Sequence, residues 1–349
     1  MSELIGGDEV IEISSQYSES AHQYFTDIFY RLPLNTQRSY KSDLNSYSLF
    51  CQVNDLPSLT SNMITTEESI KAYVSSMCRS QLTHNTIVHR MTTLSKFMSI
   101  AKLPDPLKHS EYLRDFIKLE MREHDIYNRA KQAPALTLDI LNTINDNVVP
   151  DTLLDIRDLA LINVMFDGLL RADEVISIQL KHINFEKQSL LIPRSKTDQQ
   201  GRGSIRHISN TSLAYISDYL HEAKLSMKLQ SEKDPTGINK GILFRSLSPK
   251  GTSLLPYDEN PTRVKDMKKL NYTTLYRALK RIAQKAGITL EISAHSPRVG
   301  GAVSMAEANI SMNKIQDAGG WKSAAMPARY TEQANIGSGM AELSEKFKR

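Results

Sequence analysis

Six residues between positions 171 and 330 occur in an order that constrains the fold of this chain more than any other feature. They are Arg171, Lys196, His295, Arg298, Trp321 and, nine residues after the tryptophan, Tyr330. A phenol is a weak nucleophile at neutral pH, because its ordinary pKa is about 10. Guanidinium groups bind phosphate oxygens in a fork and neutralise the charge that develops there. The set therefore predicts a fold that brings a tyrosine and several cations to one phosphodiester.

The sequence around these residues resembles the tyrosine recombinase family of the phage-integrase type. The matching boxes are Gly168-Leu-Leu-Arg171-Ala-Asp-Glu174, His295-Ser-Pro-Arg298-Val-Gly-Gly, Ala318-Gly-Gly-Trp321 and Ala328-Arg-Tyr330. The likeness is close near the C-terminus and limited to motifs in the N-terminal third. It implies an enzyme without a metal or a cofactor, in which the tyrosine forms a 3′-phosphotyrosine bond and frees a 5′-hydroxyl. That bond keeps the energy of the broken one, so religation needs no ATP.

The resemblance also implies roles for the individual residues. Arg171, His295 and Arg298 would hold the scissile phosphate, and Lys196 would protonate the leaving 5′-oxygen. His295 is also a candidate to carry the proton of Tyr330, because its ordinary pKa near 6.5 allows both protonation states near neutral pH.

Three of the assignments have competitors. Lys196 lies between two short apolar runs that predict a β-hairpin, and Arg194 and Arg202 are neighbouring alternatives. Glu174 either forms a common helical ion pair with the arginine three residues before it, or holds the histidine or an arginine in place. Trp321 is the only tryptophan, and either packs beneath the tyrosine helix or donates its indole N–H to the phosphate.

The composition fits a two-domain intracellular protein. A chain of 349 residues, 40% of them hydrophobic, is long enough for two cores. Cys51 and Cys78 are too few for a disulfide scaffold or a zinc cluster, so a reducing cytoplasm is expected. The sequence has no apolar run of membrane-spanning length and no basic N-terminal segment followed by an apolar one. We therefore expect neither secretion nor a membrane partner.

Charge is spread unevenly along the chain, whose formal net charge is +4. Residues 1–30 hold six acidic and no basic side chains, and residues 31–130 hold 13 basic and 10 acidic ones. Segment 251–285 holds eight basic and three acidic side chains. The acidic leader is expected to be disordered and to lie away from DNA. The basic segment is either a solvated surface or, as we prefer, a surface that contacts phosphates.

The sequence predicts a mainly α fold in two domains. After the leader at 1–15, residues 16–127 form an all-helical, SAM-like DNA-binding domain. A linker without apolar periodicity follows at 128–134, and residues 135–349 form a catalytic domain of helices with a small antiparallel sheet. The type of each domain follows from the resemblance, and the boundaries follow from the pattern of apolar residues.

Two helices expected in the first domain, at 35–53 and 84–101, have one apolar and one polar face. The apolar stripes are Tyr40, Leu44, Tyr47 and Cys51 in the first and Ile87, Met91, Leu94 and Met98 in the second. The resemblance implies that the polar faces enter the major groove, where Asn reads adenine and Arg reads guanine. Ordinary solvated faces are the alternative. The polar faces carry Arg38, Lys41, Ser42, Asn45, Asn85, His89, Thr92 and Lys96.

Local signals place the other elements. Thr65-Thr66-Glu67-Glu68 offers a capping box for a helix that contains Ile70. In the second domain we expect helices near 137–147, 154–167, 171–179, 210–228 and 272–286. Strands are expected near 182–186, 189–193 and 204–208.

Two helices near the C-terminus have predicted partners. The helix at 272–286 points Leu275, Leu279 and Ile282 inward, and the resemblance implies that its other side enters the major groove. That side carries Thr273, Arg277, Lys280 and Arg281, with Thr274 roughly where the family pattern has a base-reading arginine. A short amphipathic helix at 338–347, with Met340, Leu343 and Phe347, is either local core or, as the resemblance favours, docks on a neighbouring protomer.

Together these patterns predict a site-specific DNA recombinase. The resemblance implies that two protomers bind an inverted-repeat site on double-stranded DNA, and that two sites assemble into a tetramer that exchanges strands twice through a four-way junction. The expected setting is the bacterial nucleoid, a plasmid or another mobile element. The alternatives are a hairpin telomere resolvase, a chromosome-dimer resolvase, a topoisomerase or, less favoured, a DNA-binding module without catalysis.

Overall fold

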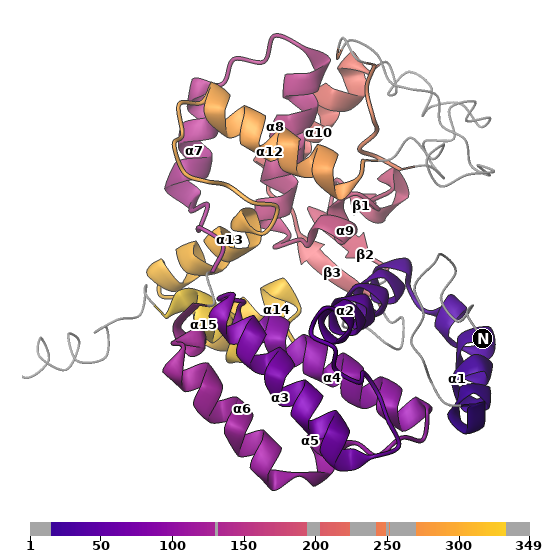
Figure 1. Ribbon diagram of the computed structural model, residues 1–349. Coiled ribbons are helices and arrows are strands. Elements are labelled where there is room, and N and C mark those ends of the chain that lie inside the picture. The colour runs from indigo at the N-terminus through magenta and orange to yellow at the C-terminus, as the bar shows by residue number, and fades with distance from the viewer. Residues whose placement is uncertain are drawn as a thin grey trace, which may run out of the picture. The chain divides into compact units, whose positions relative to one another are not determined.

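The structure, a computed structural model, describes residues 15–129, 132–193, 203–223, 242–248, 251 and 270–332. The chain divides into two compact units, Met1–Lys131 and Gln132–Arg349. Figure 1 shows helices in both units and, within the described residues, one small sheet in the second unit. The predicted mainly α fold with a small antiparallel sheet is confirmed.

The first unit is a group of helices packed around one apolar core. The faces predicted to be apolar supply much of this core. Ile87, Leu94 and Met98 are fully buried on one helix, and Leu44 and Tyr47 are buried on another. The elements are α1 (Ser15–Asp27), η1 (Phe29–Arg31), α2 (Leu34–Val53), α3 (Met63–Arg79), α4 (His84–Ile100), α5 (Pro106–His109), α6 (Glu111–Glu123) and η2 (Ile126–Arg129).

The capping box predicted at Thr65 is wrong, because α3 begins two residues earlier. The side chain of Asn62 accepts hydrogen bonds from the N–H groups of Ile64 and Thr65, at 2.9 and 3.2 Å. Asn is a preferred N-cap residue because its side-chain oxygen satisfies the free N–H groups of the first turn. Thr66 is instead fully buried, with its hydroxyl 3.0 Å from that of Thr60.

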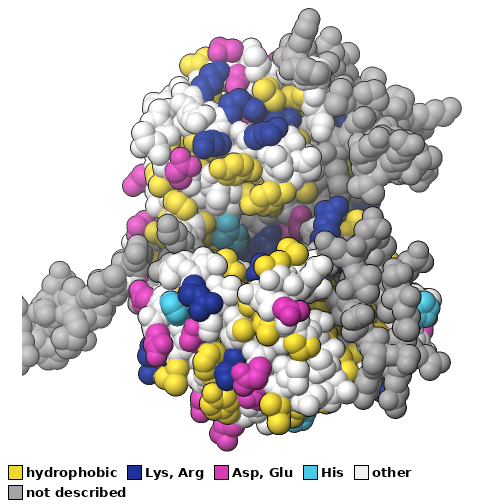
Figure 2. Space-filling view, in the orientation of Figure 1, with side chains coloured by type: hydrophobic (Ala, Val, Ile, Leu, Met, Phe, Trp, Pro, Cys, Tyr) yellow, Lys and Arg dark blue, Asp and Glu magenta, His cyan; other side chains and the backbone are white. Residues whose placement is uncertain are grey.

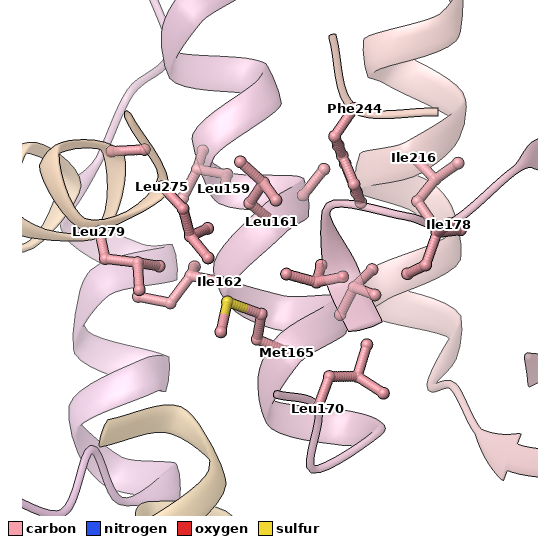
Figure 3. Close-up of a cluster of buried hydrophobic side chains, with 14 of the residues drawn as sticks. Leu159, Leu161, Ile162, Met165, Leu170, Ile178, Ile216, Phe244, Leu275 and Leu279 are labelled. Atoms are coloured by element: carbon pink, nitrogen blue, oxygen red, sulfur yellow. The ribbon is translucent and has the colours of Figure 1, made fainter. Parts of the chain in front are cut away.

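The second unit is built around α8, which is buried along most of its length. In Figure 3, Leu159 and Ile162 of α8 lie toward Leu275 and Leu279 of α12, one of its packing partners. α8 also buries polar side chains, among them Arg157 and Asp158, which form an ion pair of 2.8 Å within the core. The helices of the unit are α7 (Leu138–Asn147), α8 (Leu153–Asp167), α9 (Ala172–Val175), η3 (Leu180–His182), α10 (Asn210–Glu222), α12 (Tyr272–Lys285), α13 (Ser296–Glu307), α14 (Met312–Gly319) and α15 (Ala325–Thr331).

Three short antiparallel strands form the sheet in the order β1-β2-β3. They are β1 (Ile183–Asn184), β2 (Ser189–Ile192) and β3 (Ser204–His207). In the register of β2 and β3, Leu190 faces Arg206 and Leu191 faces Ile205. The antiparallel pair predicted on either side of Lys196 is therefore confirmed.

The helix predicted over 171–179 is wrong in its second half. α9 ends at Val175, and Gln179 forms an isolated bridge with Ile242. The N–H of Leu243 also donates to the carbonyl of Ile178, at 2.7 Å. Residues 242 and 243, more than 60 positions away along the sequence, thus bond to the backbone of residues 178 and 179. Local periodicity does not reveal such a distant partner.

α13 packs closely against two neighbouring segments at Gly300 and Gly301, and only at Gly300 would a side chain overlap the backbone. A Cβ atom at Gly300 would overlap the backbone carbonyl of Leu136. The same stretch is fixed by a hydrogen bond of 3.1 Å from the Leu136 N–H to the Ser296 carbonyl. A Cβ atom at Gly301 would meet the end of the Leu169 side chain, which can move.

Gly300→Ala is therefore expected to destabilise the protein by about 3 kcal/mol, and Gly301→Ala by about 1 kcal/mol. The two substitutions gain the same helix propensity, so their difference isolates the clash with backbone. Denaturant unfolding of both variants measures it. Equal stability of the two variants would show that the Leu136 segment moves aside at no cost.

Some sequence predictions lie outside the described residues. These are the disordered leader at 1–15 for all but its last residue, the lysine Lys196 with its neighbours Arg194 and Arg202, part of the basic segment at 251–285, and the tail helix at 338–347. Within the described ranges, none of the helices has both the length and the apolar character that crossing a bilayer requires.

Candidate active site

Tyr330 and His295 are in direct contact in the second unit. The Nε2 atom of His295 lies 2.9 Å from the phenol oxygen of Tyr330, and the ring centroids are 5.7 Å apart. Tyr330 is on α15, and His295 is the residue before α13, so the packing of these two helices brings the side chains together. In the turn before α13, the Ser293 N–H donates to the Ser296 hydroxyl at 2.9 Å. A phenol within hydrogen-bond distance of an imidazole is the arrangement that a tyrosine nucleophile and a base would need.

Arg298 is buried next to this pair. It is 1% exposed, and its Nη1 and Nη2 atoms donate to the backbone carbonyls of Leu169 and Gly319, the second at 2.9 Å. The Cζ atom of Arg298 lies 4.1 Å from the centroid of the Trp321 ring. Trp321 packs edge-on against Tyr330, with centroids 6.0 Å apart. These contacts give Trp321 a packing position, and its bond to a phosphate stays a prediction.

Arg171 is held by Glu174. The Nη1 atom of Arg171 lies 2.8 Å from Oε1 of Glu174, and the backbone N–H of Arg171 donates to Oε2 at 2.8 Å. The side chain of Arg171 is 23% exposed, whereas that of Glu174 is only 5% exposed. The sequence left open whether Glu174 forms an ion pair with Arg171 or holds a catalytic side chain in place. The structure shows the ion pair, and this pair also fixes the direction of the Arg171 side chain.

The charge state of the site at neutral pH follows from burial and from the arginines. Burial lowers the pKa of His295, and the positive charges of Arg298 and Arg171 lower it further. Burial raises the pKa of Tyr330, against the opposite effect of the same arginines. Burial and the nearby Arg171 lower the pKa of Arg298 to about 9, so Arg298 still carries its charge. At neutral pH a neutral imidazole thus lies beside a protonated phenol.

Within about pH 5 to 8, cleavage by the free enzyme is expected to lose activity only below pH 6.5, because the pKa of about 9 at Arg298 lies above this range. At low DNA concentration the pH profile reports the pKa values of the free enzyme. His295 is neutral above its pKa, which is lowered from the ordinary 6.5, so the rate falls as the pH drops through that lowered value. The rate of adduct formation between about pH 5 and 8 measures this. His295→Gln should slow the reaction and remove the acid limb, and an unchanged limb in that variant would assign it to another group.

The sequence analysis missed one buried cation at this site, Arg206 on β3. It is 6% exposed, and its Nη1 atom donates to the carbonyl of Asp317 on α14, at 3.1 Å. The sequence of β3 is Ser-Ile-Arg-His, and nothing in this pattern indicates that its arginine is buried. Only the antiparallel pairing of β3 with β2 turns this side chain inward.

The polar faces of α2 and α4 are exposed to different degrees. Arg38, Ser42, Asn85, His89 and Thr92 are exposed, as predicted. The other three residues, Lys41, Asn45 and Lys96, are half-buried.

Two of these exposed or half-buried side chains are held by neighbours within the unit. The Nζ atom of Lys96 donates to the phenol of Tyr40 at 3.0 Å. The Nδ1 atom of His89 lies 2.7 Å from Oδ2 of the buried Asp43, so the direction of the imidazole is fixed and its other nitrogen is turned away from that carboxylate. A DNA-contacting role for either residue stays a prediction.

The predicted outward direction of Arg281 is wrong for its guanidinium, which pairs with the fully buried Asp158 of α8. Arg157 of the same helix pairs with one oxygen of this carboxylate, and Arg281 pairs with the other. Figure 2 shows basic side chains gathered over α12. Of the other residues predicted to face DNA there, Arg277 and Thr273 are exposed, Thr274 is half-buried, and Lys280 lies 3.5 Å from Glu291.

The described part of the chain contains no cluster of three or more His, Cys, Asp or Glu side chains that could hold a metal ion. The cations that the structure shows at the site are the side chains of Arg171, Arg206 and Arg298, whereas Lys196 lies outside the described residues and its role stays a prediction.

A mainly helical unit in which a tyrosine meets a histidine among buried arginines is the architecture of the tyrosine recombinases, which are DNA strand transferases. A family model described as the phage integrase family matches residues 134–335. The chain belongs to this family and is a tyrosine site-specific recombinase.

Two curated relatives are similar to most of the chain. An integrase/recombinase XerD homologue from Selenomonas ruminantium is 27% identical over 314 residues, which cover 86% of this chain and 82% of the relative. The recombinase Cre of Escherichia phage P1 is 23% identical over 347 residues and 94% of each chain.

Solved structures show the same fold at low sequence identity. The integrase of transposon Tn1549, in complex with transposon right end DNA, has a TM-score of 0.61 at 12% identity, over 96% of this chain and 99% of that one. The XerH recombinase, bound to a palindromic difH substrate, has a TM-score of 0.59 at 14% identity, over 96% and 91% of the two chains.

Proposed function

We propose that this recombinase cuts and rejoins DNA through a 3′-phosphotyrosine bond to Tyr330. The observation that carries the proposal is the distance of 2.9 Å between the phenol oxygen and Nε2 of His295, beside the guanidinium of Arg298. A phenol with a raised pKa needs a base to take its proton and cations to receive the phosphate. The side chains around Tyr330 offer both.

Each group has one task in the proposed cleavage step. The Tyr330 oxygen attacks the phosphorus and gives its proton to His295. The bond from phosphorus to the 5′-oxygen breaks, and the electron pair stays on that oxygen, which takes a proton from Lys196. Arg171 and Arg298 bind the non-bridging oxygens, with Arg171 directed by its ion pair with a carboxylate. Religation is the reverse reaction, with a 5′-hydroxyl from another strand as the nucleophile.

DNA recognition is proposed for exposed polar side chains on three helices. α2 and α4 in the first unit and α12 in the second carry residues that suit base edges and phosphates. On α12 we keep Thr273, Thr274, Arg277 and Lys280 and remove Arg281, because its guanidinium pairs with Asp158. In the first unit we keep Arg38, Lys41, Ser42, Asn45, Asn85, His89, Thr92 and Lys96.

The proposal also includes the assembly. Two protomers bind an inverted-repeat site, two such sites form a tetramer, and strands are exchanged twice through a four-way junction. The similarity to phage P1 Cre over 94% of both chains supports this Cre-like scheme. A plasmid or other mobile element in a bacterial cytoplasm is the proposed setting. The tail at 338–347, proposed to dock on a neighbouring protomer, lies outside the described residues.

The test is to incubate the protein with supercoiled DNA of the replicon that carries its gene, and to map covalent adducts at nucleotide resolution. We expect adducts on 3′-phosphates at two positions within an inverted repeat, and recombined circles when two such sites are present. Relaxed circles alone would indicate a topoisomerase, and covalently closed hairpin ends would indicate a telomere resolvase. Absence of any adduct would refute strand transfer by Tyr330.

A further inference from the structure

Arg206 is a buried charge that the proposed reaction does not yet use. Along β3 the outward position holds Ile205, which is 72% exposed, whereas the inward position holds Arg206, which is 6% exposed. An apolar side chain outside and a cation inside is the reverse of what burial energetics favour. Such a local conflict is expected where a residue serves function rather than stability.

Arg206 and Arg298 hold the same end of α14. Arg206 donates to the carbonyl of Asp317 at 3.1 Å, and Arg298 donates to the carbonyl of Gly319 at 2.9 Å. The last carbonyls of a helix lack partners within the helix and carry its negative partial charge, so guanidiniums suit this place. A Cβ atom at Gly320, the next residue, would collide with the Arg206 guanidinium. Trp321 follows directly, and its ring lies against Arg298.

The site around Arg206 has more positive than negative charge. Burial lowers the pKa of Arg206, and the charge of Glu174 opposes this effect while that of Arg171 adds to it, so all three groups lie within electrostatic reach. Glu174 also raises, and Arg206 lowers, the pKa of Arg298. Both carboxylate oxygens of Glu174 are already bonded to Arg171. Among the described residues, three guanidiniums thus meet one carboxylate.

The excess of positive charge matches the reaction. A phosphodiester carries one negative charge, and the five-coordinate phosphorus reached during attack by the tyrosine carries two. Buried guanidiniums without a full set of anionic partners stabilise that charge without having to reorganise. The Nε atom of Arg206 is also buried and has no hydrogen-bond partner among the described residues.

We infer that Arg206 is a positioning residue of the active site, which fixes the end of α14, and with it Arg298 and Trp321, while adding a third guanidinium charge near the phosphate. The inference rests on the proposed phosphotyrosine chemistry. β3 also follows the chain segment that contains Lys196, so Arg206 links this part of the sheet to the helix that precedes Trp321.

Arg206→Met tests the inference, because methionine fills most of the buried volume and removes the charge, while the carbonyl of Asp317 still accepts a hydrogen bond from the Gly320 N–H. We expect a folded protein, a DNA dissociation constant within about threefold of wild type and a rate of cleavage at saturating DNA lowered by about 10- to 100-fold. Arg206→Lys keeps the positive charge but loses the two-pronged guanidinium. Its cleavage rate should lie between those of wild type and Arg206→Met. His207→Met, at the exposed neighbouring position of β3, is the matched control.

The measurement uses the full chain and a duplex that carries the mapped site, nicked so that the short 5′-hydroxyl fragment diffuses away and the adduct accumulates. A folded Met variant that cleaves at the wild-type rate would overturn the inference. If the Arg206→Met variant does not fold, the cleavage rate of the Arg206→Lys variant is the test instead. Cleavage by that variant at the wild-type rate would also overturn the inference. Wild-type protein and the Tyr330→Phe variant are assayed alongside. If the wild-type protein forms no adduct, the proposed phosphotyrosine chemistry fails, and this outcome is distinct from a failure of the inference on Arg206.

Discussion

Tyr330→Phe is expected to bind its DNA site with wild-type affinity and to form no covalent adduct. The substitution removes one oxygen, which contacts Nε2 of His295 at 2.9 Å, and leaves the ring that packs against Trp321 in place. The ring of Tyr330 is buried, with 7% of the residue exposed, and phenylalanine keeps that ring. The variant therefore loses a hydrogen bond but no packing, and its fold should persist. The expected loss of cleavage is complete, since no other group can replace a nucleophile.

Denaturing electrophoresis of labelled DNA measures the adduct, and a protease digest shows whether it contains protein. Tyr272→Phe is the matched control, because that tyrosine is exposed at the start of α12 and far along the sequence from the site. A protease-sensitive adduct formed by Tyr330→Phe would show that another side chain is the nucleophile.

Arg298→Ala and Arg171→Ala are each expected to lower the rate of cleavage at saturating DNA by about 10²–10³, the effect of losing one preorganised donor to an oxyanion. Affinity for DNA should change far less, because many phosphate contacts elsewhere contribute to it. Lys187→Ala, an exposed lysine between β1 and β2, is the control for the loss of a surface charge.

The two arginine variants should differ in stability. Arg298→Ala leaves the carbonyls of Leu169 and Gly319 without their donor and removes the group that stacks on Trp321. Each unpaired buried acceptor costs about 1–3 kcal/mol. Arg171→Ala affects a side chain that is 23% exposed, and the backbone N–H of residue 171 still bonds to Glu174. Rates are therefore compared well below both melting temperatures. Weak binding with wild-type cleavage at saturation would make these residues positioning contacts for DNA.

The sequence by itself determined the helical framework and the chemistry of the proposed site. The stripe at Ile87, Leu94 and Met98 needed no tertiary information, because a helix that buries one face must repeat apolar residues with its own period. The pattern of arginine, histidine and tyrosine was equally readable, since a phosphodiester and a phenol demand those groups. The order of the motifs led to the family that the match over 134–335 shows.

The tertiary structure decided which charged side chains are buried and where helices end. α9 stops at Val175 because residues 178 and 179 pair with 242 and 243, a partner distant in sequence. Arg281 turns to Asp158 and Arg206 turns to α14, although a basic residue in an isolated helix or strand is expected to face water. Apolar periodicity is a property of one segment, whereas the partner of a buried charge comes from another. That partner exists only once the chain has folded.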